Sequence, residues 1–314
     1  MVKVAGIDCG TNSIRLLIAT VEPGQPLRDL ERTMTVVRLG QGVDKTGMFA
    51  HDALERTFDA AERYADLCRQ HEVETIKFVA TSATRDAGNR DLFVSGIEER
   101  LGVTPEVISG QREAQLSFYG AASVIDSPEP VAVVDLGGGS TEIVLGSVTD
   151  GVIGSHSMNV GCVRMHERHL VSDPPTEDEI AAARSDVRAA LDEAASVVDL
   201  SRATRLVGLA GTVTTVTARA LGLTHYDPAR IDGATLSVDR VLAACEWLMT
   251  ATREERSAEG YMHPGRVDVI PAGALVWSEV IRRCAAEMVS LDSVTTSEHD
   301  ILDGIALWAA GRLA

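Results

Sequence analysis

Few features in this sequence would mark a redox, zinc or membrane protein. Its 314 residues include only five cysteines, scattered at Cys9, Cys68, Cys162, Cys245 and Cys284, and no two are spaced as CxxC. An odd, scattered set of thiols argues against a disulfide framework or a zinc site and favours a reducing, cytoplasmic compartment. The chain lacks the run of about 18 apolar residues that a membrane span needs. Its N-terminus has no apolar signal core, so we expect neither a span nor an export signal.

Positive charge is also scarce. Lysine and arginine total 29 against 46 aspartates and glutamates, which gives a formal net charge of −17, and the only lysines are Lys3, Lys45 and Lys77. Proteins that bind nucleic acids or anionic lipids through broad basic surfaces have the opposite balance. We therefore expect no nucleic-acid or membrane partner. The preference for arginine suits bidentate phosphate contacts, although a GC-rich genome produces the same bias.

The chain does contain an internal sequence repeat. Residues 4–21 read VAGIDCGTNSIRLLIATV and residues 131–148 read VAVVDLGGGSTEIVLGSV, so that Asp8 recurs as Asp135. Each copy is an apolar strand, an acidic residue, a glycine-rich turn and a second apolar strand. Such turns let backbone N–H groups approach an anion closely, and an acid at the strand end can hold Mg²⁺ or a water. The repeat therefore predicts two phosphate-binding half-sites.

The length and the repeat together predict two domains, because single cores rarely grow beyond about 250–300 residues. The best linker candidate is 126–130, where Pro128 and Pro130 cannot sit inside a helix or a central strand. We therefore expect an N-terminal domain at 1–125 and a C-terminal domain at 126–297.

The pattern of elements restarts after this linker. Before it we expect strands at 2–7, 14–21, 30–39, 76–80 and 105–108 and helices at 51–71 and 90–101. After it we expect strands at 131–134, 142–145, 152–158 and 205–209, with a helix that begins at a capping box at Thr176 and reaches about 198. This order predicts mixed sheets with helices on their faces.

Polar residues at strand ends supply further candidates. Thr81, Ser82 and Arg85 follow the strand at 76–80, where free N–H groups and the helix dipole favour an anion. Gly211 and Thr212 follow the corresponding strand of the second half. An ordinary helix N-cap would give the same patterns, so both interpretations stay open for these segments.

Other candidates have weaker local support. Glu113 lies in or near the first turn of a helix, where most acids only complement the helix dipole. The eight histidines lack metal-ligand spacing, and no Ser-His-Asp or Cys-His order stands out. Cys9, inside the first turn, is more typical of a packed thiol than of a nucleophile.

These motifs, in this order, resemble the exopolyphosphatase and guanosine pentaphosphate phosphohydrolase (Ppx/GppA) family. The resemblance covers essentially the whole chain and is carried by the segments 8–13, 80–89, 109–114, 135–142, 208–212, 265–273 and 297–304. It implies an α/β fold of two ribonuclease-H-like, actin-like lobes with mixed sheets flanked by helices and an active site in the interdomain cleft. It also implies that a final helix, 298–314, packs on the first lobe and that the protein is a homodimer.

The resemblance also implies roles for individual residues. Glu113 matches the base that activates the attacking water, and Asp135 and Glu142 match acids that bind Mg²⁺, or Mn²⁺ in its place, or orient that water. Asp8 is a third candidate metal ligand. The implied phosphate-binding residues are Asp8, Gly10, Thr11, Asn12, Ser13, Arg15, Thr81, Ser82, Arg85, Gly137, Gly138, Gly139, Ser140, Thr141, Gly211, Thr212 and Arg266.

The chain departs from the family pattern in two ways. Arg112 stands where many members have a second acid beside the catalytic glutamate. The chain also stops after the second lobe, whereas long members continue into a helical region, which implies a preference for short polyphosphates or little processivity here.

The function that the resemblance implies is Mg²⁺-dependent hydrolysis of the terminal phosphate of inorganic polyphosphate. We expect Arg85→Ala mainly to weaken substrate binding. Three alternatives stay open: hydrolysis of guanosine pentaphosphate at the same site, an ATP-dependent kinase of the same fold, and a non-catalytic sensor of polyphosphate or of the alarmone.

Overall fold

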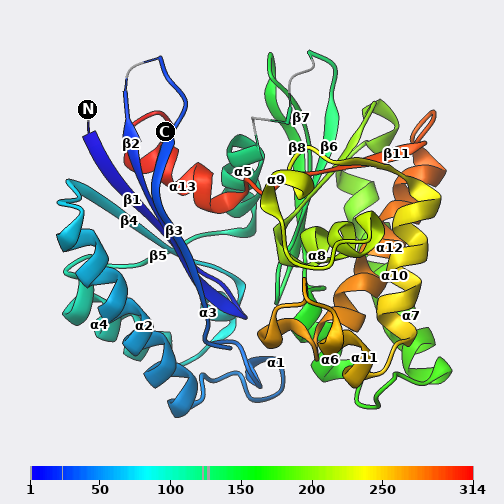
Figure 1. The fold of residues 1–314 in the computed structure, drawn as a ribbon, viewed down its shortest axis with the longest axis horizontal. Coiled ribbons are helices and arrows are strands. Elements are labelled where there is room, and N and C mark those ends of the chain that lie inside the picture. Colours follow the sequence, from blue (N-terminus) through cyan, green and yellow to red (C-terminus); the bar gives the residue numbers. More distant parts are fainter. Residues whose placement is uncertain (1, 23, 122–123, 126–127, 314) are drawn as a thin grey trace. The chain divides into compact units, whose positions relative to one another are not determined.

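A computed structural model of the chain describes residues 2–22, 24–121, 124–125 and 128–313. It contains two compact units, Met1–Gly120 with Ile301–Ala314 and Ala121–Asp300 (Figure 1). Two residues of the predicted linker, Asp126 and Ser127, lie outside the described residues. The domain boundary at that point therefore stays a prediction.

The first unit is built on a five-stranded sheet of order β3-β2-β1-β4-β5. Its strands are β1 (Val2–Cys9), β2 (Ser13–Val21), β3 (Arg28–Val36), β4 (Thr75–Ala80) and β5 (Glu106–Val107). β1 and β2 form the predicted hairpin, β3 continues it in antiparallel, and β4 pairs in parallel with the other edge of β1. The sheet is therefore mixed, as predicted.

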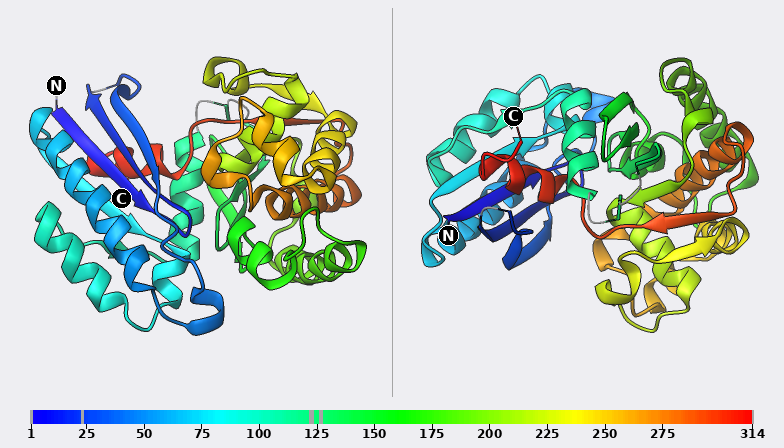
Figure 2. Two further views of the ribbon diagram at one scale, coloured as in Figure 1. Left: turned by 60° about the horizontal axis from the view of Figure 1, so that its bottom comes forward. Right: turned by 90° about the horizontal axis from the view of Figure 1, so that it is seen from above.

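Helices cover both faces of this sheet. They are α1 (Val43–Thr46), α2 (His51–Gln70), α3 (Ser82–Asp86), α4 (Arg90–Leu101), α5 (Gly110–Gly120) and α13 (Ile301–Ala309). Side chains alternate along β1, so Ile7 packs in one core with Phe58 of α2, whereas Val4 packs with Leu302 of α13. A Cβ at Gly6 would lie 3.0 Å from the backbone N of Ala306, which shows how closely α13 lies on β1 (Figure 2).

The second unit is built on a six-stranded sheet of order β10-β11-β9-β6-β7-β8. Its strands are β6 (Val131–Leu136), β7 (Thr141–Ser147), β8 (Gly151–Met158), β9 (Leu206–Leu209), β10 (Thr235–Ser237) and β11 (Ser293–Thr296). Its helical segments are α6 (Cys162–His169), α7 (Glu177–Val197), η2 (Leu200–Arg202), α8 (Ala210–Leu221), α9 (Pro228–Ile231), α10 (Val238–Thr250), α11 (Arg253–Ala258), η3 (Pro264–Arg266) and α12 (Ile270–Glu287).

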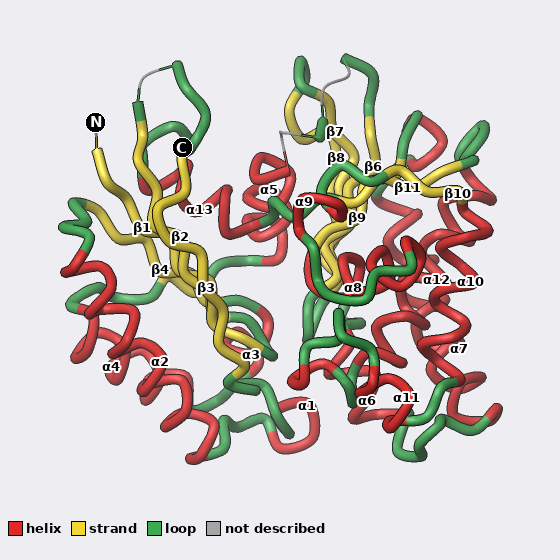
Figure 3. The backbone as a smooth tube through the Cα atoms, in the orientation of Figure 1, coloured by secondary structure: helices red, strands yellow, loops and turns green. Residues whose placement is uncertain are grey.

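The internal sequence repeat is matched by the topology of the two sheets. The strands β6, β7, β8 and β9 pair in the same order and directions as β1, β2, β3 and β4 (Figure 3). α7 begins at the predicted capping box, in which Thr176 and Glu179 exchange hydrogen bonds. The predicted α/β fold of two lobes, each with a mixed sheet flanked by helices, is confirmed.

One predicted strand was wrong at its end. The run at 30–39 leaves the sheet after Val36, and Arg38 has a positive φ of 53°. The Asn12 carbonyl accepts hydrogen bonds from the N–H groups of Val37 and Arg38, so the chain folds over the turn between β1 and β2. This tertiary contact overrides the extended pattern of the sequence.

None of the helices in the described part of the chain combines the length and the apolar character that a membrane-spanning segment requires.

Candidate functional site

The first glycine turn joins β1 to β2, and its carbonyl groups are held by the chain that follows β3. The Gly40 N–H donates to the Thr11 carbonyl at 2.8 Å, and the Val37 and Arg38 N–H groups donate to the Asn12 carbonyl at 3.1 and 2.8 Å. The C=O and N–H of a trans peptide point in opposite directions. The N–H groups of Asn12 and Ser13 therefore point away from this supporting chain, toward the side where an anion could bind.

The second glycine turn joins β6 to β7, and the first turn of α6 supports it. The N–H groups of Cys162 and Val163 donate to the carbonyls of Gly137 and Gly138 at 3.0 and 2.9 Å. Arg164 also donates Nε to the Gly139 carbonyl at 2.7 Å. Helix N-termini leave such N–H groups without helical partners. Here they bond the carbonyls of Gly137 and Gly138, so the N–H groups of the same peptides, those of Gly138 and Gly139, point the other way.

Gly161 makes this support sterically feasible. A Cβ at this residue would lie 2.4 Å from the Gly138 oxygen and 2.7 Å from the Gly139 nitrogen. No site residue was predicted in the segment 161–164, since a glycine before a helix is its only local signal.

The acids beside the two turns have different partners. Asp8 stands opposite Arg15 in the β1–β2 ladder, and Arg15 donates Nη2 and Nε to Asp8 Oδ2 at 2.6 and 3.0 Å. At the corresponding place in the β6–β7 ladder, Asp135 stands opposite Glu142. Both acids are buried, and Ser157 donates its hydroxyl to Glu142 Oε1 at 2.6 Å. The first turn thus carries an ion pair where the second carries two acids.

This pair of acids suits a divalent cation. Directly opposite residues lie on one face with Cβ atoms about 4.5–5.5 Å apart, and neighbouring carboxylates repel unless a proton or a cation is shared. Carboxylate oxygens are ligands that Mg²⁺ prefers, and it commonly takes one or two of them together with phosphates and water. Asp135 and Glu142 therefore fit Mg²⁺, whereas Asp8, already bonded by Arg15, fits less well. Among the described residues no group of three His, Cys, Asp or Glu side chains is arranged for a metal.

Glu113 lies in the first turn of α5 and is only 8% exposed. Its Oε2 accepts a hydrogen bond from Arg85 Nη1 at 2.6 Å. Burial raises the pKa of Glu113 to about 7, while Arg85 and a hydrogen bond with Thr81 act in the opposite direction and the charge of Asp8 adds to the rise. A general base works best when its pKa lies near the working pH. The environment of Glu113 therefore suits a general base, which its local sequence could not show.

Arg112 turns out to face another part of the first unit. Its guanidinium lies 4.5 Å from the ring centroid of Trp308 in α13, and Lys77 contacts the same ring at 4.1 Å. The departure from the family pattern at Arg112 thus forms a packing contact between α5 and α13.

In the second unit, Gly211, Thr212 and Arg266 come together at the start of α8. A Cβ at Gly211 would lie 2.2 Å from Arg266 Cζ, so the guanidinium lies directly on this backbone. Ala210, just before Gly211, has a positive φ of 68°. Strained backbone of this kind clusters at ligand-binding sites, which supports a functional role for this turn.

Sequence reasoning missed the residues that support Arg266. The buried Arg256 donates Nε to the Val267 carbonyl at 3.0 Å, directly after Arg266. Near Arg266, Tyr226 donates its hydroxyl to Glu298 Oε1 at 2.6 Å, and burial raises the pKa of Glu298.

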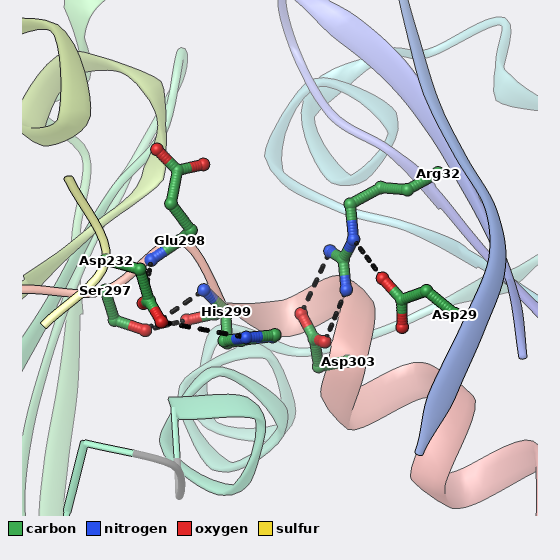
Figure 4. A network of polar contacts seen from close by, with 7 residues as sticks. All are labelled: Asp29, Arg32, Asp232, Ser297, Glu298, His299 and Asp303. Carbon is green, nitrogen blue, oxygen red and sulfur yellow. Dashed lines mark hydrogen bonds and ion pairs between the residues drawn. The ribbon is translucent and has the colours of Figure 1, made fainter. Parts of the chain in front are cut away.

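Figure 4 shows two polar networks around the segments 297–303 and 29–32. In the second unit, Asp232 Oδ1 accepts the Glu298 N–H at 3.0 Å. In the first unit, Arg32 donates to Asp29 and to Asp303, and so ties β3 to α13. Arg32 and Asp303 were not among the predicted site residues, and their contact holds β3 and α13 together.

The predicted site residues fall into two groups, one in each unit. In the first unit, the Thr81 N–H donates to the Cys9 carbonyl at 3.3 Å, and Gly10 lies beside the Thr81 hydroxyl. The group in this unit is Asp8, Gly10, Thr11, Asn12, Ser13, Arg15, Thr81, Ser82, Arg85 and Glu113. The group in the second unit is Asp135, Gly137, Gly138, Gly139, Ser140, Thr141, Glu142, Gly211, Thr212 and Arg266.

Comparison with known proteins identifies the family of the chain. The model of the Ppx/GppA phosphatase family matches residues 17–308. The chain belongs to the Ppx/GppA phosphatase family. It is 49% identical to Exopolyphosphatase 2 of Mycobacterium tuberculosis, and the match covers 99% of each chain.

Two further Ppx/GppA-type matches cover most of the chain. A solved structure of an exopolyphosphatase-like protein superposes with a TM-score of 0.94 at 48% identity and covers 100% of this chain and 99% of its own. A guanosine-5'-triphosphate,3'-diphosphate pyrophosphatase of Pseudoalteromonas atlantica is 32% identical over 73% of this chain and 45% of its own length.

Proposed function

We propose that this chain is an exopolyphosphatase, which removes the terminal phosphate of inorganic polyphosphate as orthophosphate. The observation that carries the proposal is Glu113, a buried carboxylate with a pKa raised to about 7 that is bonded to Arg85. It lies beside Thr81 and the glycine turn after β1. The mycobacterial relative named for this activity matches the chain from end to end, which supports a phosphoanhydride hydrolase.

The residues divide the reaction between them. The N–H groups of the glycine turns and the guanidinium of Arg85 bind phosphate oxygens, and Glu113 accepts the proton of the attacking water. Phosphoryl transfer depends mainly on positioning and charge stabilisation. A Mg²⁺ ion held by Asp135 and Glu142 would supply part of that charge stabilisation. The leaving group is a weakly basic phosphate oxygen, so a strong general acid is unnecessary.

Phosphate release by the purified protein tests the proposal. We expect release of orthophosphate from tripolyphosphate and longer polyphosphates in the presence of Mg²⁺. No release from any polyphosphate, with or without Mg²⁺ or Mn²⁺, would overturn it. ADP formation from ATP with an acceptor would instead favour a kinase, and tight binding without release would favour a sensor.

The second candidate is hydrolysis of guanosine pentaphosphate, a nucleotide of the stringent response. The match to the enzyme of Pseudoalteromonas atlantica favours it, and contacts directed at phosphate serve both substrates. A kcat/KM for guanosine pentaphosphate above that for tripolyphosphate would make it the main activity.

The assembly and the location of the protein belong to the same proposal. The family resemblance supports a homodimer in the cytoplasm, and five buried free cysteines agree with a reducing compartment. Light scattering on the purified protein, measured as it elutes from a size-exclusion column, would give the mass of the assembly.

A further inference from the structure

Arg85 uses only one of its nitrogens for protein contacts. Nη1 donates to Glu113 Oε2 at 2.6 Å and to the Ile108 carbonyl at 3.0 Å. Within the described residues, Nε and Nη2 have no hydrogen-bond partner, and the side chain is 22% exposed. The guanidinium is a planar fork, so one edge is anchored in the protein while the other is available to a ligand.

The anchor on Ile108 matters because it does not depend on Glu113. Ile108 lies between β5 and α5, two residues before the start of the helix that carries Glu113. Its backbone carbonyl therefore fixes Arg85 relative to the same segment that presents the base. Glu113 in turn has one oxygen, Oε2, bonded to Arg85, so the orientation of its carboxylate follows that of the guanidinium.

We propose that Arg85 is a positioning residue for Glu113 as well as a phosphate ligand. One edge of its guanidinium orients the carboxylate through Nη1, and the opposite edge, Nε and Nη2, binds the terminal phosphate. The rigid fork then sets the distance between the base and the phosphorus atom. This inference rests on the proposed function and adds a role that phosphate binding alone would not require.

The proposed chemical step forms one bond, breaks another and transfers one proton. The oxygen of the attacking water forms a bond to the terminal phosphorus, and the bridging P–O bond breaks with its electron pair on the shortened chain. The proton of the water passes to Glu113. Reactions of this type lose rate steeply when the reacting groups are displaced by about 1 Å. Loss of Arg85 should therefore lower kcat, beyond the weaker binding that the sequence predicts.

The charges around Glu113 give a second readout. Arg85 faces it from α3 and Asp8 from β1, Asp8 is itself paired with Arg15 from β2, and Arg112 on α5 contacts Trp308 instead. Without Arg85, the remaining charge that acts on Glu113 is that of Asp8, which favours the protonated form. The acid limb of the rate profile should therefore move to higher pH.

The experiment compares Arg85→Ala and Arg85→Lys with the wild type. For Arg85→Ala we expect a rise in KM, a fall in kcat of about 10²-fold or more, and an acid limb shifted upward by about one pH unit. Lysine restores the charge but has no second edge, so Arg85→Lys should recover KM more than kcat. Added guanidinium ion should raise the kcat of Arg85→Ala. A rise in KM alone, with kcat and acid limb unchanged, would overturn the proposal.

Arg112→Ala is the matched control. It removes the same charge from the residue next to Glu113 without touching the carboxylate, so its acid limb should stay at the wild-type pH. A shift equal to that of Arg85→Ala would show that general charge, and not the hydrogen bond, is responsible.

A readout without turnover separates this inference from the proposed function. If the wild type releases no phosphate, the function fails, but the titration of a ¹³C-labelled Glu113 carboxyl still tests the contact with Arg85. We expect its midpoint to rise in Arg85→Ala and to change less in Arg85→Lys. An unchanged midpoint in both variants would rule out the positioning role.

Discussion

The two glycine turns lie in equivalent hairpins but differ in the charged residues beside them. At the same place in the two hairpins, Asp8 faces Arg15 and Asp135 faces Glu142. The first hairpin therefore pairs its acid with an arginine, whereas the second places two acids opposite each other, an arrangement that suits a divalent cation. The comparison shows that the two copies keep the same hairpin but differ at one matching position, Arg15 against Glu142. We propose that this position decides which copy holds the metal.

The supports of the two turns differ as well. An irregular segment, in which Arg38 takes a positive φ, holds the first turn, and the N-terminus of α6 holds the second. In both cases the carbonyl groups of the turn are bonded, so the N–H groups of the same peptides point away from the supporting chain. The predictions below test this division of roles, in order of decreasing effect.

The largest effect should come from the base in the first unit. Glu113→Gln keeps an oxygen for Arg85 but cannot accept the proton of water, so kcat should fall by roughly 10²–10⁴-fold. Binding of tripolyphosphate, measured by calorimetry, should change little. Turnover like that of the wild type would assign the base to another residue.

The next largest effect should distinguish the two copies of the hairpin by their dependence on Mg²⁺. Glu142→Gln removes one of two facing carboxylates, and we expect the Mg²⁺ concentration for half-maximal activity to rise by about 10-fold or more. Arg15→Gln, the change at the matching position of the first copy, should alter KM but not this Mg²⁺ requirement. An equal rise in the required Mg²⁺ concentration in both variants would contradict the proposed difference between the two copies.

A smaller effect should follow from crowding the second turn. Gly161→Ala places a methyl group against Gly138, so we expect a loss of about 1–3 kcal/mol in the free energy of unfolding in urea, with weaker phosphate binding. Gly154→Ala is the control, because the nearest atom to its added Cβ is 3.9 Å away. Equal stability of the two variants would contradict the packing described for Gly161.

The smallest effect concerns pH. The wild-type kcat/KM should fall as the pH drops below about 7, where Glu113 gains its proton. The folded state also binds this proton more tightly than the unfolded state, so the contribution of Glu113 to stability should decrease as the pH rises from about 4.5 to about 7. A rate profile that is flat from pH 5.5 to 8 would contradict the raised pKa.

The sequence alone predicted the parts of the site that are local. The hairpins, the acids at their strand ends and the glycines are contiguous in the chain, so the repeat at Asp8 and Asp135 was sufficient to place them. The role of Glu113 came from family resemblance, because a first-turn acid is unremarkable until its burial is known. Its partner Arg85 lies 28 residues away, and no local pattern joins the two.

What could not be predicted depends on tertiary contacts. The support of the second turn by Gly161 and the N–H groups of α6 arises only after the helix has docked. The end of β3 was wrong for the same reason, since Asn12 draws Val37 and Arg38 out of the sheet. The contact of Arg112 with Trp308 likewise joins segments distant in the chain.

The division between the two copies is tested most directly by Mn²⁺ binding, measured by electron paramagnetic resonance with tripolyphosphate present. Asp135→Asn should lose bound Mn²⁺, whereas Asp8→Asn should retain it even if activity falls. Retention by Asp135→Asn together with loss by Asp8→Asn would contradict the assignment of the metal to the second turn.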